Sequence, residues 1–227
     1  MKNKVFIAWD TTSVKKIEEI IKKTKNSKIE IGYKFGLEFL NSKTGRAYVS
    51  KLRNKIIFAD LKLHDIPNTC VSAINAIKDL KVNYLTIHIS SGLEALKAAK
   101  KASGKIKLIG VTILTSLNNK ALKEIGFDKD IKKLVLHQAR LASKARLDAI
   151  VCSAQEVKLV KKVFKKEIIT PGIRFSSKKN DQKRTLTPKQ AIANGANWLV
   201  IGRDITKGNI KKNIKKLIDH LNRWLKD

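Results

Sequence analysis

The sequence has few cysteines and no long apolar run. Cys70 and Cys152 are its only two cysteines, with no CxxC pair. This excludes the disulfide framework of a small secreted domain, and we expect both thiols to be buried by packing. The longest apolar runs, such as VFIAW and LIGV, are far shorter than the roughly 20 residues of a membrane-spanning helix. Asp10 comes too early for the apolar region of a signal peptide. We therefore expect a soluble, cytoplasmic protein without a membrane partner.

Aromatic residues are also scarce, at 6% of the chain, so the stacking platforms that bind single-stranded nucleic acid would be rare. The 49 Lys and Arg residues outnumber the 19 Asp and Glu and give a net charge of +30, which makes nucleic-acid binding a candidate function. The lysines are spread along the whole chain, however, and Lys211, Lys212, Lys215 and Lys216 interleave with apolar residues at helical spacing. We interpret them as solvated helix faces, so nucleic acid is not the expected partner, although the charge would help to attract an anionic substrate.

Signatures of a metal site or a dinucleotide cofactor are missing from the sequence. The four histidines, His64, His88, His137 and His220, show no metal-ligand spacing. The turn after the first predicted strand reads WDTTS and lacks the glycines of a dinucleotide-binding turn. We expect neither a metal nor a cofactor, so that charged side chains must carry the chemistry.

Short apolar, β-branched segments alternate with amphipathic segments of helical period, which is typical of parallel βαβ units. Eight strands, each followed by a helix, predict an α/β fold of the closed (β/α)₈ type, the TIM barrel, as a single domain over residues 1–227. The polar stretch 176–186, after the seventh strand, is predicted to be a mobile loop beside the functional face. The predicted strands are 4–10, 29–35, 56–62, 84–89, 106–113, 148–153, 167–171 and 198–202.

Local signals place several of the helices between these strands. Ser13 is expected to cap the first helix. Thr187 followed by Pro188 is typical of an N-cap and a first helical residue, and Gly195 is expected to end that helix. The last helix should begin near Ile210 and bury one apolar stripe.

Charged side chains end several of the predicted strands, where barrels hold their chemistry. Asp10 lies at the end of the first strand, Lys34 at the end of the second, and Asp60 and Lys62 at the end of the third, with Asp65 in the next loop. Asp60 and Lys62 are two residues apart, so strand alternation would point both into the barrel mouth. Such a pair alone would suggest a structural salt bridge. Five alternating charges at strand ends instead predict a preorganised electrostatic field.

Positive and small residues follow the last strands. Arg174 comes after the seventh strand, Gly202 ends the eighth, and Arg203 follows it. Loops at these two places often build a phosphate site in barrels. Gly202 would let a backbone N–H approach a phosphate closely, and the two arginines could hold its oxygens.

At residues 58–69 the chain reads FADLKLHDIPNT, which closely resembles the D-x-K-x-x-D-I-P-x-T signature of the orotidine 5′-phosphate decarboxylase family. The DxKxxD core alone is shared with related phosphosugar barrels, whereas its combination with the later motifs is highly specific. At residues 88–92 the chain departs from the family with HISSG, where small residues and a glycine pair would be usual. Over nearly the whole chain and in the family's order, the resemblance continues through YKFGLEF, VTILTS, VCSAQE, TPGIR, NDQ and VIGRDIT.

The resemblance implies a function and a role for each of these residues. It implies conversion of orotidine 5′-phosphate to uridine 5′-phosphate and CO₂ without a cofactor, with Lys62 as proton donor in a charged array. The other members of that array are Lys34, Asp60 and Asp65. The resemblance also implies a homodimer in which Asp65 and Thr69 serve the partner subunit's site. The implied substrate-binding positions are Asp10, Lys34, Thr69 and Thr115, with Arg174, Gln182, Gly202 and Arg203 on the phosphate side.

Two alternatives stay open at this point. The nearer one is a magnesium-dependent phosphosugar decarboxylase or aldolase of the same barrel group, which would share the DxKxxD core but not HDIPNT or the PGIR and NDQ pair. Sensitivity to a chelator would separate it from a metal-free enzyme. The other is a basic nucleic-acid-binding protein, whose affinity for random DNA would fall steeply with salt.

Overall fold

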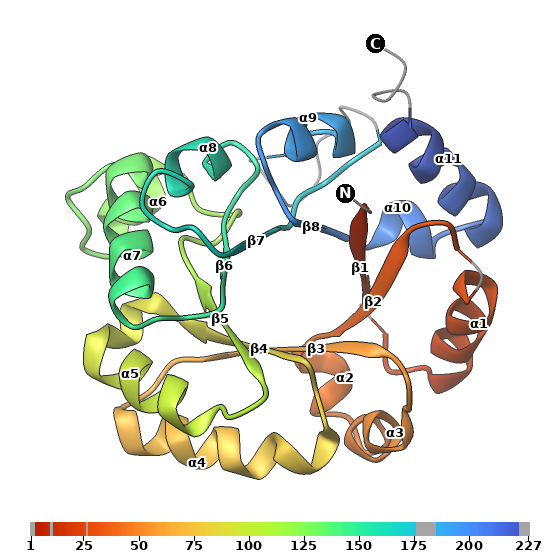
Figure 1. The fold of residues 1–227 in the computed structure, drawn as a ribbon, viewed down its shortest axis with the longest axis horizontal. Helices are drawn as coiled ribbons and strands as arrows, with labels where there is room; N and C mark the ends of the chain where they lie inside the picture. The colour runs from red at the N-terminus through yellow and green to blue at the C-terminus, as the bar shows by residue number, and fades with distance from the viewer. Residues whose placement is uncertain (1–2, 10, 26, 176–184, 223–227) are drawn as a thin grey trace.

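The computed structural model describes residues 3–9, 11–25, 27–175 and 185–222. Eight parallel strands follow one another around a closed barrel in chain order, and β1 pairs with β8 to close it. In Figure 1 these strands form the central ring. The strands are β1 (Lys4–Trp9), β2 (Glu30–Phe35), β3 (Ile56–Leu63), β4 (Tyr84–His88), β5 (Lys107–Val111), β6 (Ala149–Val151), β7 (Glu167–Thr170) and β8 (Trp198–Ile201).

The predicted (β/α)₈ barrel is confirmed, and each predicted strand is present to within two residues at either end. Most strands are almost continuous runs of buried residues, as in the sequence IAW of β1 and WLVI of β8. Both faces of a strand are covered in such a barrel, one by the interior and the other by helices. Apolar runs in the sequence therefore mark the strands well.

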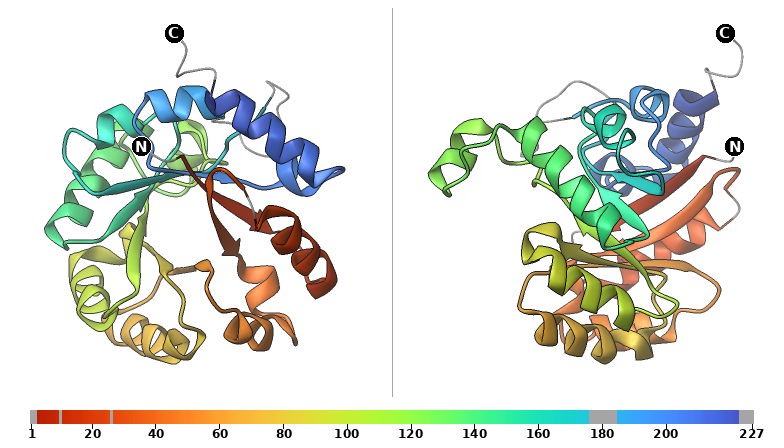
Figure 2. Two further views of the ribbon diagram at one scale, coloured as in Figure 1. Left: turned by 45° about the vertical axis from the view of Figure 1, so that its right-hand side comes forward. Right: turned by 60° about the vertical axis from the view of Figure 1, so that its left-hand side comes forward.

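Helices cover the outside of the barrel, as the views in Figures 1 and 2 show. The α-helices are α1 (Val14–Thr24), α2 (Leu37–Leu40), α3 (Gly45–Lys51), α4 (Pro67–Ile77), α5 (Gly92–Ala102), α6 (Asn119–Glu124), α7 (Ile131–Lys144), α8 (Val157–Val160), α9 (Pro188–Ala193), α10 (Arg203–Thr206) and α11 (Ile210–Asn222). Two 3-10 turns, η1 (Lys78–Leu80) and η2 (Ile89–Ser91), follow α4 and β4.

The local helix signals agree with the structure. Ser13 caps α1 by accepting a hydrogen bond from a backbone N–H of the first turn. Thr187 and Gln190 form a reciprocal capping box at the start of α9. Beyond the end of that helix, Gly195 has a φ of +100°, a conformation that favours glycine. Helix α11 begins at Ile210, as predicted.

Aromatic side chains fill the inside of the barrel. Phe6 of β1 stacks on Trp198 of β8, with ring centroids 4.1 Å apart, and meets Phe58 and Tyr84 edge-on. Phe6 needs the space beside Gly32, because a Cβ there would lie 2.5 Å from its ring. These rings belong to one buried cluster drawn from most of the strands. The interior is therefore a packed core and not a channel.

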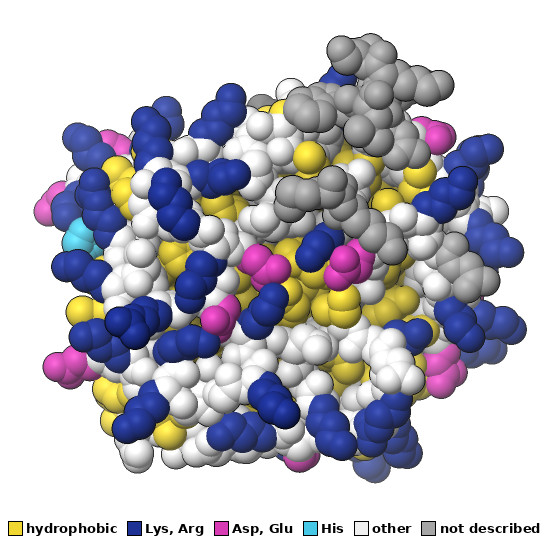
Figure 3. Space-filling view, viewed as in Figure 1, with side chains coloured by type: hydrophobic (Ala, Val, Ile, Leu, Met, Phe, Trp, Pro, Cys, Tyr) yellow, Lys and Arg dark blue, Asp and Glu magenta, His cyan; other side chains and the backbone are white. Residues whose placement is uncertain are grey.

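Positive charge is spread over the surface of the protein. On the face that Figure 3 shows, Lys and Arg side chains lie on all sides, with few Asp and Glu between them. The four lysines named above on α11 are exposed, while Ile214 and Leu217 between them are buried, which fits their interpretation as a solvated helix face. Within the described ranges, no helix is both long enough and apolar enough to cross a membrane.

Candidate active site

A cavity of about 270 Å³ opens at the C-terminal ends of the strands. Its wall is built by residues that end the strands or follow them directly, which is where barrel enzymes hold their chemistry. Seven of the residues predicted from the sequence lie in this wall: Lys34, Asp60, Lys62, Thr115, Arg174, Gly202 and Arg203.

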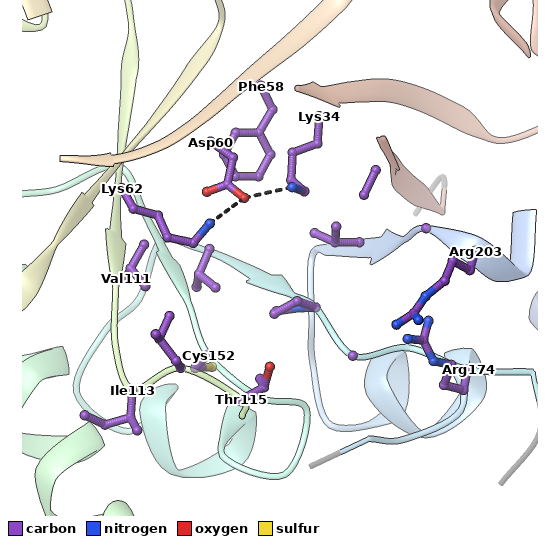
Figure 4. A pocket seen from close by; sticks show the side chains of 17 residues that line it. Lys34, Phe58, Asp60, Lys62, Val111, Ile113, Thr115, Cys152, Arg174 and Arg203 are labelled. Atoms are coloured by element: carbon purple, nitrogen blue, oxygen red, sulfur yellow. Dashed lines mark hydrogen bonds and ion pairs between the residues drawn. The ribbon is translucent and has the colours of Figure 1, made fainter. Parts of the chain in front are cut away.

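Two lysines converge on one carboxylate oxygen in this cavity. The Nζ atoms of Lys34 and Lys62 lie 2.8 and 2.9 Å from Oδ2 of Asp60, and Figure 4 draws both contacts. Lys34 comes from β2 and the other two residues from β3. Asp60 is buried, and both lysines are partly buried. The structure thus brings these three residues together as one cluster.

The two ammonium groups set the ionisation of Asp60. Burial of this carboxyl group raises its pKa, but Lys34 and Lys62 more than offset that effect and lower the pKa to about 2. Asp60 is therefore ionised at neutral pH, and its single negative charge offsets only one of the two positive charges. The cluster presents a net positive charge to the cavity, which would stabilise negative charge developing in a bound molecule.

The stretch of β3 that carries Asp60 and Lys62 is irregular. The pairing of β3 with β4 shifts between Ala59 and Leu63, so this part of β3 is not a regular strand. Lys62 has a φ of +50°, a left-handed conformation that is uncommon for a residue with a side chain. Both side chains line the cavity, as the sequence predicts, although the chain between them departs from the regular strand on which that prediction is based.

Thr86 of β4 also belongs to this cluster, although no prediction from the sequence includes it. Its hydroxyl accepts a hydrogen bond from the backbone N of Lys62 at 2.8 Å and donates one to Oδ1 of Asp60 at 3.1 Å. The side chain is fully buried. A hydroxyl within the otherwise apolar run YLTI is the signal that could have revealed it, since a buried polar group needs partners.

Two arginines face the cavity on the side away from Asp60. Arg174 follows β7 and Arg203 begins α10, and Figure 4 shows their guanidinium groups next to each other. Arg174 is 7% exposed, and its Nε has no hydrogen-bond partner among the residues that the structure describes. Its Nη1 lies 4.0 Å from Oδ1 of Asp204. Two adjacent cations, one with a buried N–H left to donate, are suited to an anion with several oxygens.

Gly202 lies at the same end of the cavity as the arginines. A Cβ built there would come no nearer than 3.6 Å to the backbone O of Ala8, which is ordinary van der Waals contact. Packing within the barrel therefore does not require glycine at this position. The missing side chain instead leaves the backbone open toward the cavity, where a ligand could approach it.

Two predicted residues, Asp10 and Gln182, lie outside the described residues, as does most of the predicted loop 176–186. The chain on either side of that loop is tied together. The backbone N of Arg174 donates a hydrogen bond to the backbone O of Leu186 at 3.1 Å. Both ends of the loop therefore start from fixed positions beside the arginine end of the cavity.

Asp65 and Thr69 lie outside the wall of their own barrel's cavity. Both residues are exposed, just before α4 and in its first turn. Oδ1 of Asp65 accepts a hydrogen bond from the backbone N of Ile66 at 2.7 Å. Ile66 is 66% exposed, which leaves a large apolar side chain uncovered beside the two polar ones.

Apolar side chains at the ends of β5 and β6, and in the residues that follow them, build another part of the wall. Val111, Ile113, Val151 and Cys152 belong to it, and Figure 4 shows Val111, Ile113 and Cys152 on one side of the cavity. Cys152 is buried, as expected from its packing, and it also lines the cavity. Sequence reasoning misses this wall because its residues sit in the same apolar runs that mark the barrel core.

His64 and His88 lie together near the cluster, with ring centroids 5.1 Å apart. Burial, with smaller effects from His64 and Lys62, lowers the pKa of His88. Nε2 of His64 is 3.3 Å from Oγ of Ser90, so His64 has a hydrogen-bonding partner in η2, the turn that follows β4. In the parts of the chain that the structure covers, no three His, Cys, Asp or Glu side chains gather as they would around a metal ion.

The sequence of the chain matches a known family over most of its length. The model of the orotidine 5′-phosphate decarboxylase / HUMPS family matches residues 3–216. The chain belongs to this family. The matched range contains every site residue that the sequence predicts, from Asp10 to Arg203.

Curated relatives and a solved structure carry the same name. Orotidine 5′-phosphate decarboxylase of Wolbachia sp. subsp. Brugia malayi (strain TRS) is 44% identical over 223 residues, covering 95% of this chain and 97% of the relative. The enzyme of Carboxydothermus hydrogenoformans is 40% identical over 218 residues, covering 90% of each. The crystal structure of orotidine 5′-phosphate decarboxylase from Lactobacillus acidophilus has a TM-score of 0.81 at 29% identity, covering 97% of this chain and all of that one. The similarity therefore extends over whole chains and not over one motif.

Proposed function

We propose that this member of the family is an orotidine 5′-phosphate decarboxylase, a carboxy-lyase that forms uridine 5′-phosphate in pyrimidine biosynthesis. The observation that carries the proposal is the convergence of Lys34 and Lys62 on Oδ2 of Asp60, in a cavity whose other end holds Arg174 and Arg203. The names of the curated relatives and of the solved structure support the same reaction.

The proposed reaction breaks the bond between C6 of the pyrimidine and the carboxylate carbon, and it leaves the electron pair on C6. The ammonium group of Lys62 stabilises this charge and then donates a proton to C6, while the neutral amine regains a proton from water. Asp60 holds Lys62 in place, and Lys34 adds a second positive charge. This mechanism uses no metal ion and no cofactor.

The phosphate group of the substrate fits the arginine end of the cavity. We assign its oxygens to Arg174 and Arg203, with the backbone at Gly202 as a further donor. Among the described residues, Nε of Arg174 has no hydrogen-bond acceptor. This supports the assignment, because a buried N–H without an acceptor gains most from an anion. By the resemblance, Thr115 in the wall contacts the substrate, and Asp10 and Gln182 are expected to do the same.

We further propose a homodimer in which Asp65 and Thr69 complete the partner subunit's site. Both residues follow β3 closely, yet they lie outside the cavity wall of their own barrel and are exposed. The exposed side chain of Ile66 between them would be covered by a second subunit. A cytoplasmic location stays a prediction from the sequence.

The two alternatives have less support. The related phosphosugar barrels use magnesium, and the full-length relatives reported above are orotidine 5′-phosphate decarboxylases. A basic nucleic-acid-binding protein would gather its positive charge into a patch or stripe, whereas the face shown in Figure 3 has it on all sides.

An absorbance assay with orotidine 5′-phosphate, run with and without a metal chelator, tests the proposal. We expect uridine 5′-phosphate to form at the same rate in both arms. Decarboxylation that the chelator abolishes would contradict the metal-free mechanism, and a chelator-sensitive reaction with a phosphosugar in place of orotidine 5′-phosphate would favour the magnesium-dependent alternative. A folded protein without any turnover would contradict the proposed function.

A further inference from the structure

We propose that Thr86 is a positioning residue for the reaction: its one hydroxyl holds both the backbone of Lys62 and the carboxylate of Asp60. This inference rests on the proposed function for its catalytic consequence. Its structural basis is independent of that function, because it consists of two hydrogen bonds to a fully buried side chain.

The first step is the position of Thr86 opposite an irregular part of β3. The two strands pair at Ala59 with Leu85 and again at Leu63 with Ile87. Between these pairs, residues 60–62 of β3 lie opposite Thr86 alone. Extra residues on one strand leave ladder groups without their usual partners. The Thr86 hydroxyl supplies one such partner, because it accepts the hydrogen bond of the Lys62 backbone N–H at 2.8 Å.

The second step follows from the single proton of a hydroxyl group. Because the oxygen of Thr86 accepts from Lys62, its own proton is left for Oδ1 of Asp60, 3.1 Å away. Oδ1 is thereby engaged on the side of β4. Oδ2 is left for the ammonium groups of Lys34 and Lys62. Thr86 therefore fixes the orientation of the Asp60 carboxylate, so that one oxygen faces β4 and the other faces the two lysines.

The third step concerns the backbone conformation of Lys62, whose N–H donates to Thr86. Lys62 has a φ of +50°, and such conformations persist only where the surroundings hold them. A valine at position 86 would have nearly the same shape and the same preference for a strand. A buried position in β4 therefore does not require the hydroxyl of Thr86. The hydrogen bonds to Lys62 and Asp60 do require it.

The test compares Thr86→Val, which removes the hydroxyl, with Thr86→Ser, which keeps it. A displaced catalytic group can cost about 100-fold in rate, so we expect Thr86→Val to lower kcat by about 10- to 100-fold. KM should change little, because the phosphate is held at the other end of the cavity. Thr86→Ser should recover most of kcat. A matched control is Thr24→Val, which removes a buried hydroxyl of α1 that bonds to the backbone O of Ile20 and to the hydroxyl of Tyr33 in β2.

A kcat of Thr86→Val equal to that of the wild type, or an equal loss in Thr86→Ser or Thr24→Val, would overturn the proposal. If Thr86→Val does not fold, Thr86→Ala and Thr86→Ser take its place, since both lack the methyl group and only serine has the hydroxyl. Equal kcat values for these two would also overturn it.

Hydrogen exchange of the Lys62 backbone amide separates this proposal from the proposed function. The hydrogen bond to Thr86 should protect that amide, so its exchange should be faster in the variant without the hydroxyl and unchanged in Thr24→Val. If the wild type does not decarboxylate orotidine 5′-phosphate but the Lys62 amide exchanges faster in the variant without the hydroxyl, the proposed function is contradicted and the contact between Thr86 and Lys62 is supported. Unchanged exchange at Lys62 would contradict the contact itself.

Discussion

Nζ of Lys62 lies 2.9 Å from Oδ2 of Asp60, although the strand that carries both residues loses its regular pairing between them. Local backbone geometry therefore places the proposed proton donor, and the regular alternation of a strand does not. The strands themselves depend on the buried clusters of the barrel. Substitutions at this end of β3 should for that reason change the chemistry more than the fold.

Lys62→Ala is the direct test of the proton donor. A positioned general acid contributes about 10²- to 10⁴-fold in rate, so we expect kcat to fall at least that far while circular dichroism still shows a folded barrel. Lys22→Ala, at an exposed position of α1, is the control and should keep full activity. Near-normal decarboxylation by a folded Lys62→Ala protein would contradict the mechanism.

Arg203→Ala should weaken binding of the phosphate ester selectively. Hydrogen bonds between charged groups contribute about 1.5–3 kcal/mol, so the loss should be roughly 10- to 100-fold for orotidine 5′-phosphate. The nucleoside without phosphate should lose much less. Steady-state kinetics with both compounds measures this difference, and Arg140→Ala, at an exposed position of α7, serves as the control. Equal losses for both compounds would show that Arg203 acts away from the phosphate.

Mixing two inactive variants tests the proposed contribution of Asp65 to the partner subunit's site. Lys62→Ala and Asp65→Ala subunits that exchange would form a heterodimer with one doubly defective site. Its other site would combine the intact Lys62 of one chain with the intact Asp65 of the other. We therefore expect activity to return on mixing.

If Asp65 serves its own barrel, every site keeps one defect and mixing restores nothing. Subunit exchange must be followed separately with mass-tagged chains, because dimers that do not exchange would give the same negative result. Confirmed exchange without recovered activity would place Asp65 in the site of its own subunit.

The pKa of Asp60 predicts a change of stability in acid. Its value of about 2 in the folded protein is lower than the ordinary 3.8. Folding therefore favours the ionised form, and this contribution to stability is present above pH about 4 and is lost as the pH falls toward about 2. We expect the free energy of unfolding of the wild type to exceed that of Asp60→Asn at neutral pH, and the difference to shrink across this window. Denaturant titrations at several pH values measure it, and a difference that does not change with pH would contradict the low pKa.

Most of the barrel could be predicted from the sequence, because strands buried on both faces leave apolar runs such as VFIAW. The residues at the ends of those runs could be predicted too, and Lys34 and Asp60 meet as expected. The role of Thr86 could not be predicted. It depends on the irregular pairing of residues 60–62 in the neighbouring strand β3, which leaves no pattern in the sequence around Thr86. The cavity wall at Val111 and Cys152 is likewise hidden, because a residue that lines a cavity and one that packs in a core have the same apolar character.

The left-handed backbone at Lys62 has a consequence for how this protein can change. Such a conformation costs a residue with a side chain about 1–2 kcal/mol, and glycine would adopt it without that cost. A substitution to glycine would thus relieve the backbone and remove the proton donor of the proposed mechanism. The same substitution would also remove the ion pair with Oδ2 of Asp60, so the relieved backbone and the lost ion pair would change stability in opposite directions. At φ +50°, position 62 therefore carries a side chain that the proposed catalysis requires and that its own backbone conformation disfavours.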